Sequence, residues 1–93
     1  PPVPEVAEVL FLGLRDQDES VRETAARLLR KGFNRFFQYN HRRSPITQMP
    51  AIRRWEAWYK ENRKELKWSR ERSRFELPGE EDVPEITPDK EKK

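Results

Sequence analysis

The chain has 93 residues, enough for one domain at most, and its lack of cysteine excludes disulfides and thiolate metal sites. Hydrophobic residues make up 33% and charged residues 40%, so we expect an ordered part built on the aromatic residues and a disordered part. The net charge of +3 hides a basic middle, residues 22–74, with sixteen Lys or Arg against five acids, between two ends of net charge −4 each. Such a middle favours a polyanion, an acidic protein surface or the protein's own acidic tail as its partner.

The first expected element is a helix with one apolar face. Its apolar residues recur at three- and four-residue steps: Val6, Val9 or Leu10, and Leu14. The polar run RDQDES, residues 15–20, then predicts a turn.

A second helix is expected to start at Ser20, because Ser20 and Glu23 have the spacing of a capping box. Lys31 and Gly32 provide a basic last turn and a residue suited to the left-handed C-cap. The expected apolar positions are Val21, Ala25, Leu28 and Leu29, and those left for solvent are Arg22, Arg27, Arg30 and Lys31. Residues 4–32 therefore predict an antiparallel helical hairpin.

The sequence of this hairpin, PEVAEVLFLGLRDQDESVRETAARLLRKG, resembles a HEAT repeat: a proline, an apolar helix, a short turn with an aspartate, then Val-Arg-x-x-Ala and paired leucines. The resemblance implies that Asp16 and Arg22 form a hydrogen-bonded pair that organises the repeat. Because one repeat cannot bury both of its faces, the hairpin resembles either the last repeat of an array or a lone hairpin with another partner.

Residues 33–47 are expected to cross the hairpin as an extended segment, although Phe33, Phe36, Phe37 and Tyr39 also allow one more helical turn. Ser44-Pro45 disfavours helix, and Thr47 is the expected N-cap of a third helix with Pro50 in its first turn. That helix is predicted to run to about residue 65. Its apolar stripe comprises Ile52, Trp55, Trp58 or Tyr59, and Leu66.

Residues 51–77 resemble the C-terminal closing segment of some bacterial HEAT-repeat proteins, which implies a cap made of a helix and an irregular strand-like return. The matching residues are Trp55, Trp58, Asn62, Leu66, Trp68, Arg74 and Phe75. The run PGEEDVPEITPDKEKK, residues 78–93, is rich in proline and charge and predicts a disordered acidic tail. The predicted domain is all-α over residues 1–77, with hairpin 4–32, crossing loop 33–47, and third helix with cap 48–77.

Catalysis is poorly supported by the sequence. His41 is the only histidine and stands beside Arg42 and Arg43, which disfavour its protonation and repel a metal cation. Glu80, Glu81 and Asp82 lack the ligand spacing of a calcium loop, and the glycines stand too far apart for a phosphate loop. We therefore predict no enzyme activity, cofactor, metal or small-molecule substrate.

Two other functions compete with protein binding. Aromatic residues among many Lys and Arg side chains are typical of single-strand nucleic-acid binders, but base stacking needs exposed rings. Tryptophans and basic flanks are also typical of interfacial helices, although Glu56, Glu61 and Glu65 weaken attraction to anionic lipid. We expect the tryptophans to pack in the core, because a chain with so few apolar residues needs them there. No apolar run is long enough to span a membrane, and no targeting segment predicts a compartment.

The sequence thus predicts a non-catalytic protein–protein interaction or scaffold module, an accessory subunit of a larger complex. Its expected partner is a protein with an acidic surface, and the alternative is RNA or single-stranded DNA. The expected basic contacts are Arg42, Arg43, Arg53, Arg54, Arg63 and Lys64, and the expected apolar edge is Val6, Val9 and Phe11. Structural roles are expected for Asp16, Arg22, Trp55, Trp58, Trp68 and Phe75.

Overall fold

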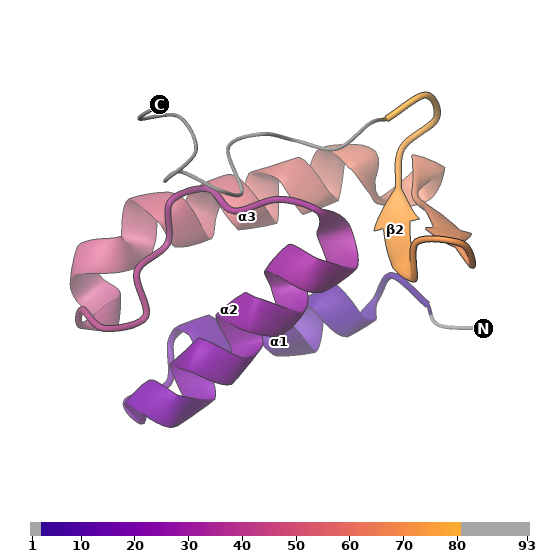
Figure 1. Cartoon of the computed structure of the whole chain (residues 1–93). Helices are drawn as coiled ribbons and strands as arrows, with labels where there is room; N and C mark the ends of the chain where they lie inside the picture. The colour runs from indigo at the N-terminus through magenta and orange to yellow at the C-terminus, as the bar shows by residue number, and fades with distance from the viewer. Residues whose placement is uncertain (1–2, 81–93) are drawn as a thin grey trace, which may run out of the picture.

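The computed structural model describes residues 3–80, which form three helices and one pair of short strands (Figure 1). The helices are α1 (Val6–Leu14), α2 (Glu19–Phe33) and α3 (Met49–Asn62), and the strands are β1 (Lys67–Ser69) and β2 (Arg74–Glu76). Short 3-10 helices, Pro45–Gln48 and Arg63–Glu65, flank α3 on either side. The predicted helical hairpin and third helix are confirmed, and the predicted positions of their ends need several corrections.

Helix α1 buries a different face from the predicted one. Ala7, Phe11 and Leu14 are buried, whereas Val6 and Val9 are exposed. The sequence VAEVLFLGL is apolar on almost every side, so its periodicity does not select a face. Contact with the aromatic side chains of α3 makes the choice, because the Phe11 ring centroid lies 6.0 Å from that of Trp55 and 5.7 Å from that of Tyr59.

Helix α2 begins one residue earlier than predicted, and its N-cap is Asp18 rather than Ser20. The Asp18 carboxylate accepts hydrogen bonds from the Ser20 backbone N–H at 2.8 Å and from the Ser20 hydroxyl at 2.7 Å. These bonds hold the pKa of Asp18 below its usual value because they favour the charged carboxylate. The predicted capping box of Ser20 and Glu23 is therefore wrong, since Ser20 donates to the cap.

The end of α2 also differs from the prediction. The helix continues through Gly32 to Phe33, and Asn34 takes the left-handed C-cap conformation with φ 58°. Asparagine tolerates this region better than other non-glycine residues, so it can replace the predicted Gly32. The chain then runs back along α3 without regular structure until the 3-10 helix at Pro45 (Figure 1). Phe37 and Gln38 form a turn with φ 54° and 59°, so this segment is irregular rather than extended as predicted.

Helix α3 supplies the centre of the core. Ile52, Trp55, Tyr59 and Leu66 are buried, which confirms the predicted stripe and selects Tyr59 over the half-buried Trp58. Pro50 lies in the first turn as predicted, but Thr47 does not cap the helix. Its hydroxyl instead donates to the Ser44 carbonyl within the preceding 3-10 helix, at 2.7 Å.

The predicted strand-like return after α3 is a small, regular antiparallel sheet, so the predicted all-α fold is corrected to a mostly helical fold with one pair of strands. Trp68 of β1 pairs directly with Phe75 of β2, and their ring centroids lie 5.0 Å apart. Phe75 also stacks on Phe33 at 5.2 Å. The strands thus close the core at the end where α2 finishes.

Two glycines of the hairpin provide a matched test of this packing. A Cβ on Gly13 would lie 2.8 Å from the Ala25 Cβ, whereas a Cβ on Gly32 would meet nothing within 4 Å. We expect Gly13→Ala to lower the free energy of unfolding by about 1–3 kcal/mol through overpacking. Gly32→Ala is expected to raise it by about 0.5–1 kcal/mol, because Gly32 lies inside the helix.

Urea unfolding of the two variants checks this prediction. A destabilising Gly32→Ala would contradict the assignment of the C-cap to Asn34, and a neutral Gly13→Ala would contradict the close approach of α1 to α2.

Candidate partner-binding surfaces

The outer side of the α1–α2 hairpin is an exposed apolar surface, which we call the hairpin face. It consists of the exposed residues Val6, Val9, Leu12, Val21 and Leu28 and the groove between them. This groove has a volume of about 380 Å³ and is lined by Val9, Leu10, Gly13, Ser20, Val21, Thr24 and Ala25. Contiguous apolar surfaces of this kind typically mark sites of interaction.

The three residues of the predicted apolar edge differ in exposure. Val6 and Val9 are exposed, but Phe11 is 5% exposed and belongs to the core. Sequence reasoning missed Leu12, Val21 and Leu28 as surface residues. Their surface position depends on which side of each helix contacts α3, and the helical period alone does not report this.

The floor of the groove forms where α1 approaches α2 closely at Gly13. Because Gly13 has no side chain, α1 approaches α2 until the glycine lies beside Val21 and Ala25. The larger side chains at positions 9, 12, 21 and 28 then stand on either side of this close contact. The face thus has both ridges and a depression, which another pair of helices can match.

All six residues of the predicted basic surface are exposed, but they do not form one cluster. Arg42 and Arg43 lie in the crossing loop, Arg53 and Arg54 lie in the first half of α3, and Arg63 and Lys64 lie in the 3-10 helix after it. About ten residues separate Arg53 from Arg63, which corresponds to roughly 15 Å along a helix. Two of the six also have contacts: Arg54 donates to the Phe37 carbonyl at 3.4 Å, and Arg63 lies 3.7 Å from the Glu8 carboxylate.

The exposed side of α3 carries a narrower basic surface, which we call the α3 basic strip. Arg53, Ala57 and Lys60 share one side of the helix by their spacing, and Lys64 follows one turn later. Within residues 3–80, none of the three basic side chains lies within ion-pair distance of a carboxylate. Lys60 was not among the predicted basic contacts.

Arg22 is buried, in contrast to the prediction that it faces solvent. It is 6% exposed, and its guanidinium Nη1 donates to the carbonyls of Asp16 at 2.9 Å and Gln17 at 2.8 Å. Its Nε donates to the His41 carbonyl at 3.0 Å. Arg22 therefore joins the hairpin turn to the crossing loop, and its contact at position 16 is with the main chain. The Asp16 carboxylate accepts from the Asp18 N–H instead, at 2.8 Å.

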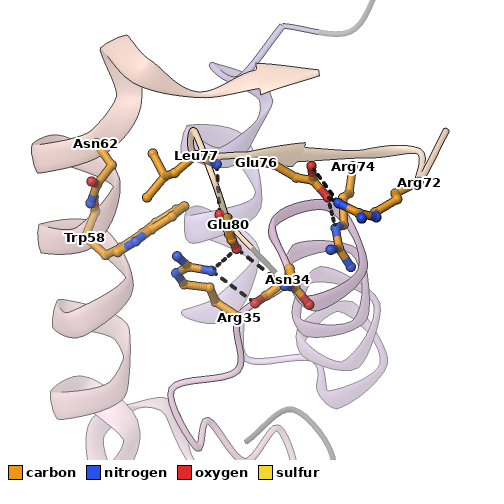
Figure 2. A network of polar contacts seen from close by, with 9 residues as sticks. All are labelled: Asn34, Arg35, Trp58, Asn62, Arg72, Arg74, Glu76, Leu77 and Glu80. Atoms are coloured by element: carbon orange, nitrogen blue, oxygen red, sulfur yellow. Dashed lines mark hydrogen bonds and ion pairs between the residues drawn. The ribbon is translucent and has the colours of Figure 1, made fainter. Parts of the chain in front are cut away.

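Figure 2 shows a second buried polar contact, which sequence reasoning missed. The Glu80 carboxylate forms an ion pair with Arg35, accepts the Leu77 N–H at 2.8 Å and lies 3.4 Å from the Asn34 side-chain amide. The Arg35 guanidinium stacks over the Trp58 ring at 4.6 Å. The Glu80 side chain is therefore packed against the domain, whereas Pro78 and Gly79 are exposed, so the contacts of the domain extend past the predicted start of the tail at residue 78. The rest of the predicted tail, 81–93, lies outside the described residues.

His41 lies in the crossing loop next to α2. Its Nδ1 atom lies 3.6 Å from the Glu19 carboxylate, beside a small pocket of about 120 Å³. The described residues contain no group of three or more His, Asp or Glu side chains placed to hold a metal ion. Across the same residues, none of the helices has the length and apolar character needed to cross a membrane.

No protein-family model matches the chain, and no curated protein or solved structure is significantly similar to it.

Proposed function

We propose that this protein is a non-catalytic protein–protein interaction module, a HEAT-like scaffold element that works as an accessory subunit of a larger complex. The observation that carries the proposal is the hairpin face, where five large aliphatic side chains stay exposed in a chain with few apolar residues to spare. Burial of these side chains against a partner supplies the association energy.

The α3 basic strip supplies electrostatic registration against an acidic partner surface. Arg53, Lys60 and Lys64 steer an acidic protein toward the module and favour one orientation of it, and salt weakens this contribution. Arg42 and Arg43 extend the positive charge into the crossing loop.

The burial of the aromatic rings disfavours the alternative, a nucleic-acid-binding function. Every Trp, Tyr and Phe of the chain lies within residues 3–80, and each of these side chains is buried or half-buried. A platform for stacking bases needs ring faces that are open to solvent. The basic strip alone offers phosphate contacts without base contacts.

Site-specific photocrosslinking tests the proposal. A benzophenone side chain is placed at Thr24 on the hairpin face, at Ala57 on the α3 basic strip and, as a control, at the exposed Ser73 of the strand turn. In extract from the native source we expect nuclease-resistant protein adducts at Thr24 and Ala57 above the level at Ser73. The adduct at Ala57 should disappear in the double variant Arg53→Glu and Lys60→Glu.

Adducts at Ala57 that nuclease removes would favour the nucleic-acid alternative instead. Equal labelling at all three positions would contradict a specific interaction surface.

A further inference from the structure

The order of apolar and charged residues along the hairpin face indicates what kind of surface can bind to it. Its α1 ridge carries Glu5, Val9 and Leu12 at helical spacings of four and three residues. The α2 ridge runs in the opposite direction and carries Val21, Thr24, Leu28 and Lys31 at spacings of three, four and three. Each ridge is thus an exposed helical strip with an apolar centre and a charged residue at one end.

Residues of the two ridges can be matched by their height, meaning their position along the common direction of the two helices. Gly13 lies between Val21 and Ala25, which places residue 13 of α1 level with about residue 23 of α2. Since both helices rise about 1.5 Å per residue in opposite directions, Glu5 is level with Lys31, Val9 with about Leu28, and Leu12 with Thr24. The acidic end of one ridge therefore lies at the same height as the basic end of the other.

We propose that the occupant of the hairpin face is a second copy of this chain. Consider a two-fold axis that lies in the plane of the interface and runs parallel to the helices. Rotation about this axis places α1 of each copy on α2 of the other, and every residue keeps its position along the helix direction. Glu5 then meets Lys31 of the other copy, Val9 meets Leu28, and Leu12 meets Thr24. Unlike charges and apolar side chains are matched twice, once on each side of the axis.

The charges available at the interface support this arrangement. Within residues 3–80, neither Glu5 nor Lys31 has an ion-pair partner. The face is about 20 Å wide, as expected of two adjacent helices, and its α1 and α2 sides are about 14 Å and about 23 Å long. Two such faces bury less than the roughly 1,200 Å² at which stable interfaces begin, so we expect a weak dimer that dissociates on dilution.

The inference rests on the proposed function, because it names the partner that the apolar part of the module meets. The α3 basic strip remains free in such a dimer, and the dimer presents two copies of it. An acidic partner with repeated sites then binds with avidity.

Sedimentation velocity of the full chain over a range of concentrations tests the inference. We expect a reversible monomer–dimer equilibrium within roughly 1–100 µM, the range of weak interfaces. Leu12→Asp, at a side chain 67% exposed, should give a folded monomer at every concentration. Ile46→Asp is the matched control, because Ile46 is 79% exposed and lies outside the hairpin face, and it should leave the dimer intact.

Charge exchange tests the arrangement of the two copies. Glu5→Lys and Lys31→Glu should each raise the dissociation constant about three- to tenfold, and the double variant should restore it. A chain that stays monomeric over the whole concentration range, or a dimer that Leu12→Asp leaves unchanged, would overturn the inference. So would a double variant weaker than both single variants.

The two proposals fail in different ways. A monomeric chain that still forms specific protein adducts at Thr24 and Ala57 refutes the dimer and keeps the interaction module. If the chain dimerises but benzophenone at Ala57 labels no other protein, the interaction module is refuted and the self-association stands.

Discussion

Replacing Trp55 with alanine is expected to remove about 3–5 kcal/mol from the free energy of unfolding, as for other buried Phe and Trp side chains. Trp55 is 2% exposed, and its ring lies against Phe11, Phe33 and Phe37 at centroid distances of 6.0, 6.4 and 4.9 Å. These residues come from α1, from α2 and from the crossing loop. Loss of the indole therefore weakens every junction of the fold at once, and total stabilities of small domains are only about 5–15 kcal/mol.

Urea unfolding followed by circular dichroism measures the effect, and Ile46→Ala is the control. Ile46 is exposed, so its truncation should change the free energy of unfolding by no more than about 0.5 kcal/mol. Iodide quenching gives an independent check: with Trp58 and Trp68 replaced by Phe, the remaining Trp55 emission should be blue-shifted and protected. Strong quenching in the folded protein would contradict the inward position of this ring.

The second large effect is expected at Arg22. Arg22→Met should lower the free energy of unfolding by about 2–4 kcal/mol, because it leaves the carbonyls of Asp16, Gln17 and His41 without their donor. Methionine keeps much of the apolar stem, so the loss reports mainly on the guanidinium. Hydrogen exchange should accelerate in the crossing loop near His41, since Arg22 hydrogen-bonds the His41 carbonyl from α2.

Arg27→Met is the matched control, since Arg27 is exposed on the same helix and should be nearly neutral. Arg22→Lys should lose most of the same stability, because one ammonium group does not reproduce the forked geometry that reaches three carbonyls. A variant Arg22→Met with wild-type stability would show that the turn and the loop are held by other contacts.

The sequence determined those features that depend on residues near each other along the chain. The number and order of the helices, the break in helical structure before Ser44-Pro45 and the apolar stripe of α3 were all predicted, because each depends on local spacing. The stripe was clear because charged residues occupy the other side of that helix. For the candidate surfaces the structure shows that Val6, Val9 and the six predicted basic residues are exposed, but it groups them differently from the prediction.

Where the local sequence pattern is compatible with more than one arrangement, only the tertiary structure determines which side chains are buried. Helix α1 is apolar nearly all round, so only the α3 aromatic residues determine that Phe11 is buried and Leu12 exposed. Buried polar contacts follow the same rule. Arg22 and Glu80 each look like ordinary surface charges in the sequence, and they are buried because backbone groups or an opposite charge, distant along the chain, meet them there. The hairpin face exists for the same reason, since it is the side of the two helices that α3 leaves uncovered.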